Sequence, residues 1–171
     1  RPTHEQYIKF ITGVVQGDFG KSYVSKVDAF DTIIERFPAT LELAITAMCI
    51  SFICGVGLGI IVSISPNGVV SRMIMAGSLF GISIPTFLIG ILLVMFFSVY
   101  LDILPSFGRG DTVQIGFWRT GFLTLSGWQH LLLPALTLSG YQLAVLIRLT
   151  RAGMRETLSE EYIKTAWAKG L

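Results

Sequence analysis

The chain has 171 residues, of which 52% are hydrophobic and only 14% are charged, whereas about 25% of the residues in a soluble domain are charged. Thirteen Lys and Arg against eleven Asp and Glu leave a formal net charge of +2, so the basic excess typical of nucleic-acid binding is absent and no nucleic-acid partner is expected. A soluble domain of this size would leave too much apolar surface in contact with water. The composition therefore indicates a membrane protein.

The N-terminal segment, 1–38, is predicted to hold two short amphipathic helices. Apolar residues within 7–15 and again within 30–37 recur at helical spacing, as in helices with one apolar face. Asp31 or Thr32 is placed to cap the second helix, and Pro38 is expected to stop or kink it. This second helix is interpreted either as an elbow on the membrane surface or as a packed helix of an extracytoplasmic cap.

Charges are missing from three long stretches, which we interpret as three membrane spans. The stretches 43–71 and 73–101 each contain 29 residues without Asp, Glu, Lys or Arg, and 120–147 contains 28. A helix of about 20 apolar residues crosses the hydrocarbon of a bilayer. The predicted spans occupy about 39–65, 73–101 and 128–150.

The distribution of basic residues predicts the orientation. Five cations follow the third span, whereas the loop 102–127 holds only Arg109 and Arg119. The positive-inside rule then places 154–171 and the turn 66–72 in the cytoplasm, and the loop outside. Three crossings put 1–38 outside as well, although its five basic residues argue for the opposite side.

No signal peptide is visible at the N-terminus, where the chain begins at Arg1 without Met. A preceding hydrophobic helix is expected to deliver the first residues to the outer face. The chain is therefore interpreted as a fragment of a longer protein.

Glycines mark the first two spans. Gly55, Gly57 and Gly59 lie inside an apolar run without the preceding strand of a dinucleotide loop, so we expect them to allow close helix packing. The second span carries small residues and a proline that form either a helix-crossing face or a break in the helix, and such a break often lines a passage. These candidate passage residues are Gly77, Gly81, Ser83 and Pro85.

The sequence predicts no catalytic site, metal site or cofactor. His4 and His130 lack ligand partners at helical spacing, and Cys49 and Cys54 point apart on a helix. We interpret His130 as an interfacial residue at the start of the third span.

The C-terminal segment is predicted to form a short helix that docks on a partner. Ser159 is placed to cap it, the adjacent Glu160 and Glu161 suit the helix dipole, and Gly170 is placed to end it. An amphipathic helix with a small-residue face suits a groove on another protein.

From Glu161 to Leu171 the sequence reads EYIKTAWAKGL, which resembles the cytoplasmic coupling loop of ABC importer permeases in the dipeptide, oligopeptide and nickel branch. The family pattern has Glu-Ala-Ala and then Gly, so that aligned on Gly170 only Ala166 and the glycine match, a departure common in this branch. Trp167 stands where relatives often carry a basic residue. Further similar segments, in family order, are GDFGKS at 17–22, ERFPATLELA at 35–44, SIPTF at 83–87, LPSFG at 104–108 and LLPALTL at 132–138.

This resemblance implies an all-α, type I ABC importer transmembrane domain with about six spans, three of them present. It implies a peptide or nickel-chelate permease in a bacterial or archaeal cytoplasmic membrane. The expected partners are ATPase subunits that hydrolyse ATP, a second homologous permease and an extracytoplasmic substrate-binding protein. The residues expected to contact the ATPase are Glu161, Tyr162, Lys164, Thr165, Ala166, Ala168 and Gly170.

Two alternatives to a transport function remain from the sequence. A membrane scaffold could use the same helix to hold a partner without moving solute. An intramembrane enzyme is disfavoured because the spans lack a recognisable acid, base and nucleophile.

Overall fold

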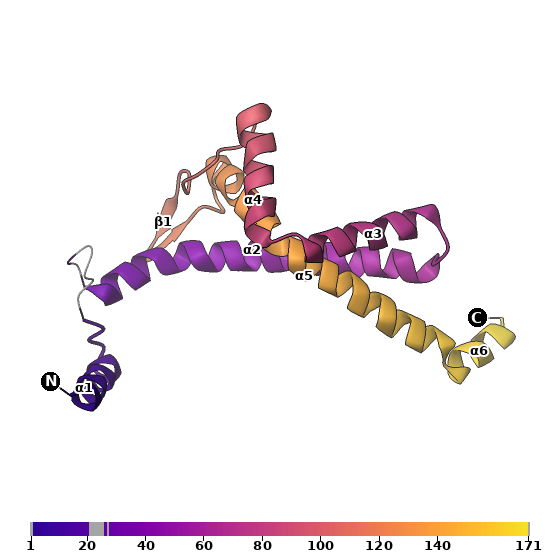
Figure 1. Ribbon diagram of the computed structural model, residues 1–171, viewed down its shortest axis with the longest axis horizontal. Helices are drawn as coiled ribbons and strands as arrows, with labels where there is room; N and C mark the ends of the chain where they lie inside the picture. The colour runs from indigo at the N-terminus through magenta and orange to yellow at the C-terminus, as the bar shows by residue number, and fades with distance from the viewer. Residues whose placement is uncertain (1, 21–25, 27, 171) are drawn as a thin grey trace.

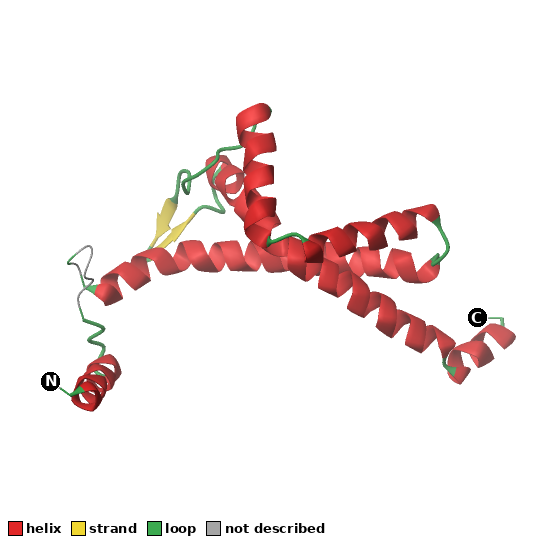
Figure 2. Cartoon of the chain, in the orientation of Figure 1, coloured by secondary structure: helices red, strands yellow, loops and turns green. Residues whose placement is uncertain are grey.

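The computed structural model describes residues 2–20, 26 and 28–170, and most of these are helical (Figures 1 and 2). A short antiparallel hairpin, in which Gln114 lies opposite Arg119, interrupts the helices. In chain order the elements are α1 (Thr3–Val15), α2 (Ala29–Ile64), α3 (Val69–Ser83), α4 (Thr86–Val94), the π-helix η1 (Met95–Tyr100), β1 (Val113–Ile115), β2 (Trp118–Thr120), α5 (Leu125–Ser159) and α6 (Glu161–Ala168).

The predicted elbow and first span form one uninterrupted helix, α2, of 36 residues. The expected caps at Asp31 and Thr32 are wrong, because Asp28 precedes the helix and its carboxylate accepts a hydrogen bond from the Phe30 backbone N–H at 3.0 Å. Pro38 lies inside the helix and is buried. The helix α1 stands apart from the bundle (Figure 1).

Helices α2 and α5 cross at a seam where two of the predicted glycines pack. A Cβ on Gly55 would lie 2.7 Å from the Leu146 Cβ, and one on Gly59 would lie 2.5 Å from the Thr150 Cβ. The close-packing prediction is therefore confirmed for these two glycines. For Gly57 it stays a prediction, because its Cβ position has no neighbour within 4 Å among the described residues.

The second span contains a break, one of the two alternatives predicted from its small residues and proline. It breaks after α3 at Ile84 and Pro85, which have extended backbone angles, and the two halves are bent by 107° (Figure 1). Proline lacks the N–H that a continuing helix would need and disfavours helical angles at the residue before it, which explains the break. By length and composition, α2 and α5 can each cross a membrane, and the bent pair is a third crossing if it counts as one span.

Helix α5 is longer than the predicted third span, because it starts at Leu125 and runs on to Ser159. Its N-terminus is capped by Thr124, whose hydroxyl accepts a hydrogen bond from the Gly127 N–H at 3.0 Å. The predicted capping role of Ser159 is wrong, since its hydroxyl donates to the Glu156 carbonyl of α5 at 2.7 Å. Glu160, in an extended conformation, separates α5 from α6.

The bundle buries small residues and exposes large apolar ones. Ala47, Ala135 and Ala144 are buried at helix contacts. Buried serines satisfy their hydroxyls locally, as when Ser63 donates to the Gly59 carbonyl at 2.7 Å. Large exposed side chains cover the outside of the helices, among them Phe52, Ile53, Met73, Phe80 and Phe87. This distribution suits a surface in contact with lipid rather than water.

Candidate functional site

The predicted docking helix is present as α6 at the far end of α5 (Figure 1). Its Glu161, Tyr162, Thr165 and Ala168 are exposed, and 62% of the Tyr162 surface is accessible. The Thr165 hydroxyl donates to the Glu161 carbonyl at 2.9 Å, so it is satisfied within the helix. The element therefore presents an open surface.

Gly170 follows α6 with a φ of +80°. This left-handed conformation is the one that a glycine adopts after the last helical residue. The predicted helix end at Gly170 is therefore confirmed. The side chains of the predicted contact residues Lys164 and Ala166 lie outside the described part of the structure, as does that of Trp167.

The predicted passage residues surround the break between α3 and α4. Gly77 and Ser83 are exposed, whereas a Cβ on Gly81 would lie 3.5 Å from the Ala144 Cβ of α5. Pro85 directly precedes α4. The four residues thus do not share one environment, since Gly81 faces α5, whereas a Cβ on Gly77 would meet no atom of another element within 4 Å among the described residues.

A buried carboxylate joins α2 to the loop between η1 and α5. Glu42 is 4% exposed. Its Oε2 accepts a hydrogen bond from the Gly121 N–H at 3.2 Å, and its Oε1 accepts one from the Trp118 indole N–H at 3.3 Å. The carboxylate also forms an ion pair with Arg109, with 3.6 Å between the Arg109 Nη2 and the Glu42 Oε2. Burial of an ionised carboxylate requires such partners.

Arg109 holds the loop together as well as pairing with Glu42. Its guanidinium also donates a hydrogen bond to the Arg119 carbonyl. The Thr124 hydroxyl donates to the Asp111 carbonyl at 2.6 Å. The loop is therefore tied to α2 by Glu42 and to the first turn of α5 by its cap residue.

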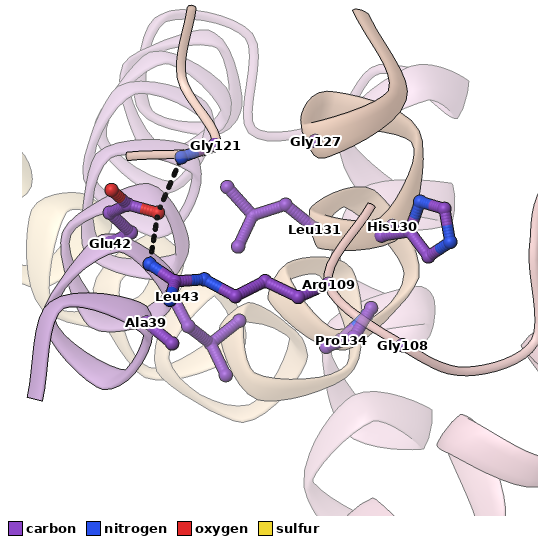
Figure 3. A pocket seen from close by; sticks show the side chains of 10 residues that line it. All are labelled: Ala39, Glu42, Leu43, Gly108, Arg109, Gly121, Gly127, His130, Leu131 and Pro134. Carbon is purple, nitrogen blue, oxygen red and sulfur yellow. Dashed lines mark hydrogen bonds and ion pairs between the residues drawn. The ribbon is translucent and has the colours of Figure 1, made fainter. Parts of the chain in front are cut away.

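Glu42, Arg109 and Gly121 are among the residues that line a cavity of about 180 Å³ between α2, α5 and the loop (Figure 3). Figure 3 shows the Glu42 carboxylate and the Arg109 guanidinium facing each other, with Leu131 beside them. The Nδ1 of His130 lies 2.7 Å from the Ser126 carbonyl of its own helix. We call Glu42, Arg109, Trp118 and Gly121 the Glu42 junction.

Sequence reasoning missed the Glu42 junction as a site. Its signal was nevertheless present, because Glu42 is the last charge before a run of 29 uncharged residues, and a carboxylate there needs a partner. Three segments quoted above for the family resemblance, 35–44, 104–108 and 132–138, each contribute residues to the cavity. Their separation along the chain concealed this convergence.

The described residues form a structural ion pair at one end and an exposed helix at the other. Within the described residues, no group of three His, Cys, Asp or Glu side chains is placed to hold a metal ion. Cys49 and Cys54 are free and exposed. The fold and the site together define a helical membrane protein with an exposed helix at one end and a tied loop at the other.

Comparison with known proteins identifies the family. Residues 55–171 match the model of the binding-protein-dependent transport system inner membrane component. The chain belongs to this family, which has the type I ABC importer transmembrane fold.

Individual relatives come from the peptide branch of this family. The chain is 40% identical over 171 residues to the glutathione transport system permease protein GsiC of Escherichia coli (strain K12), covering 100% of this chain and 51% of the relative. It is 35% identical over 183 residues to the di/tripeptide transport system permease protein DppB of Pseudomonas aeruginosa (strain UCBPP-PA14), covering 100% and 54%. The chain thus spans about half the length of the curated relatives it matches.

Proposed function

We propose that the chain is part of a permease subunit of an ABC importer that moves peptides, or a related small solute such as a nickel chelate, across a bacterial or archaeal cytoplasmic membrane. Membership of the family and the glutathione and di/tripeptide names of two relatives support this proposal. The chain itself is a translocation subunit and not an enzyme. ATP hydrolysis takes place in partner ATPase subunits.

The observation that carries the proposal is the exposed helix α6. It is separated from α5 by the extended residue Glu160, ends before the left-handed Gly170 and exposes Tyr162. We propose that this helix lies in the cytoplasm and docks into a groove of an ATPase subunit. Motion of the ATPases then reaches the spans through α5, which is continuous from Leu125 to Ser159.

The opposite end is proposed to face outward. There the loop held by the Glu42 junction would meet the extracytoplasmic substrate-binding protein. A second homologous permease would complete the passage, and Gly77, Gly81, Ser83 and Pro85 are proposed to line it near the break between α3 and α4. Exposure of Gly77 and Ser83 supports this placement, whereas the packing of Gly81 on Ala144 favours a structural role for that residue.

The docking role is tested by Gly170→Val in the assembled transporter. A β-branched residue is strained at a φ of +80°, so the helix end should shift and the fit to the ATPase should be lost. We expect normal amounts of subunit in the membrane, with loss of peptide uptake and of peptide-dependent ATPase stimulation in proteoliposomes.

Gly170→Asn is the matched control. Asparagine adopts the left-handed conformation more readily than a β-branched residue, so this variant changes the side chain at the same position but keeps the helix end. The control should retain coupled uptake. Unchanged uptake and stimulation in Gly170→Val would contradict docking through α6, and ATPase binding without any substrate-dependent stimulation in the unaltered protein would indicate a scaffold.

A further inference from the structure

Three arginines of α5 line a cleft that the proposed transport function does not use. The cleft has a volume of about 220 Å³ and lies between α3 and α5, where Met75 faces Arg148, Arg151, Ala152 and Arg155. The arginines are three and four residues apart, so they share one face of the helix. Cations and apolar side chains thus line the same small space.

Two of the arginines have donors without a partner. The Nε atoms of Arg148 and Arg151 are buried and make no hydrogen bond within the described residues. A guanidinium has five N–H donors in a planar fork that matches the oxygens of a phosphate. Buried, unpaired donors therefore indicate that an acceptor is needed at this position.

The neighbouring elements supply no negative charge. Between Leu43 and Leu101, which includes all of α3 and most of α2, the only charged residue is Arg72. The nearest acidic residues along the chain are Glu156 and Glu160, and within the part of the chain that the structure describes neither forms an ion pair with these arginines. The described residues therefore give the cleft no counter-charge.

The position of the cleft along the helices matches the edge of a membrane. Thr150, which lies between the first two arginines, packs beside Gly59 of α2. Helix α2 ends at Ile64, only about 8 Å further along at 1.5 Å per residue. The arginines therefore lie near the end of a span, where long basic side chains reach lipid headgroups.

We propose that the cleft binds the phosphate of an anionic membrane phospholipid. The guanidinium groups of Arg148 and Arg151 hold the phosphate oxygens, and Arg155 adds a third positive charge at the exposed side. Met75 and Ala152 contact the apolar part of the lipid. A phospholipid combines a negative charge with apolar chains, so it can contact both the arginines and Met75. Free phosphate has no apolar part with which to contact Met75.

The test is native mass spectrometry of the purified full-length permease with added phosphatidylglycerol or phosphatidylcholine. Both lipids contain a phosphate and acyl chains, but only phosphatidylglycerol has a net negative charge. We expect tighter binding of phosphatidylglycerol, and the double variant R148Q/R151Q should weaken this binding by about 25-fold, or about fivefold for each cation near a membrane surface.

Arg72→Gln is the matched control, because Arg72 is an exposed cation at the same end of the bundle that bonds to the Asn67 carbonyl. It should leave the lipid preference unchanged. The double variant R148K/R151K keeps both positive charges and controls for misfolding caused by substitution at these positions. It should retain most of the preference for phosphatidylglycerol. Its thermal stability should rise on addition of phosphatidylglycerol, as for the unaltered protein.

Three results would overturn the proposal. Equal binding of both lipids by the unaltered protein would remove the need for a negative charge. Displacement of phosphatidylglycerol by millimolar inorganic phosphate would indicate a site for a free anion. Unchanged lipid binding by R148Q/R151Q, together with lower thermal stability, would show that another part of the protein pairs with the arginines.

Discussion

Glu42 of α2 and Arg109 of the loop before β1 form an ion pair, with 3.6 Å between the Glu42 Oε2 and the Arg109 Nη2. The side chain of Glu42 is 5% exposed and that of Arg109 is 31% exposed. The same carboxylate accepts hydrogen bonds from Trp118 and Gly121. One side chain at the start of a span thus fixes the position of a whole loop.

Removal of the Glu42 carboxylate should loosen this loop. Glu42→Ala leaves the Gly121 N–H, the Trp118 indole and Arg109 without their acceptor, and we expect a loss of roughly 2 kcal/mol because Arg109 retains partial access to solvent. The change is measured as a lower melting temperature of the purified protein. Glu35→Ala, at an exposed position of the same helix, is the control, and an equal loss in both variants would argue against the junction.

The coupling between the two charges is measured separately. In a double-mutant cycle with Glu42→Gln and Arg109→Gln, the second substitution should cost less once the first is present, because the charge it would leave unpaired is already missing. Simple additivity of the two changes in melting temperature would mean that the ion pair contributes nothing of its own.

The seam between α2 and α5 should reject side chains at Gly59 but accept them at Gly57. A Cβ on Gly59 would lie 2.5 Å from the Thr150 Cβ, so Gly59→Val should cost about 1–3 kcal/mol through overpacking. Gly57→Val introduces the same residue two positions away, where no described atom lies within 4 Å. Thermal unfolding in detergent compares the two, and similar melting temperatures would contradict the observed helix contact.

A methyl group at Gly127 should separate the loop from α5. Its Cβ would collide with the Gly121 carbonyl, and Gly121 donates its N–H to Glu42. We therefore expect Gly127→Ala to lower the melting temperature and to increase protease cleavage within 102–124. Gly153→Ala, in open space on the same helix, should instead stabilise the protein by up to about 1 kcal/mol.

The proposed passage makes a prediction about thiol labelling. With Cys49 and Cys54 replaced by Ala, Gly77→Cys should react with a water-soluble maleimide faster than Gly81→Cys, because only the second position packs on Ala144. Labelling at residue 77 is expected to change with the nucleotide state of the ATPases. Absence of labelling at both positions in every state would exclude a water-filled passage there.

The three charge-free stretches predicted the helical regions, because a span must keep charged side chains out of lipid over its whole length. They did not predict where the helices bend. Helix α2 continues through Pro38, which lines one cleft together with the hairpin residues Phe117 and Arg119. At Pro85, by contrast, the helix is broken. The two prolines have the same local effect, so the contacts around them, which are absent from a local pattern, decide the outcome.

The exposed helix and the Glu42 junction differ in how far the sequence revealed them. The end of α6 could be predicted because a glycine after a short amphipathic run is a local signal. The capping prediction for Ser159 failed because a serine hydroxyl at a helix junction can bond to either helix. Here it donates to the Glu156 carbonyl of α5 instead of capping α6. The Glu42 junction joins residues from α2, β2 and the loop, so it depends on tertiary distances that no spacing along the chain encodes.

The break at Ile84 and Pro85 makes the helical segment beyond it a lever. The segment Thr86–Tyr100 is about 20 Å long at roughly 1.5 Å per residue. A rotation of about 10° at Ile84 and Pro85 would move Tyr100 by roughly 3.5 Å at that length. A small torsional change next to α3 would thereby be magnified into a displacement about as wide as a water molecule at the distant tip.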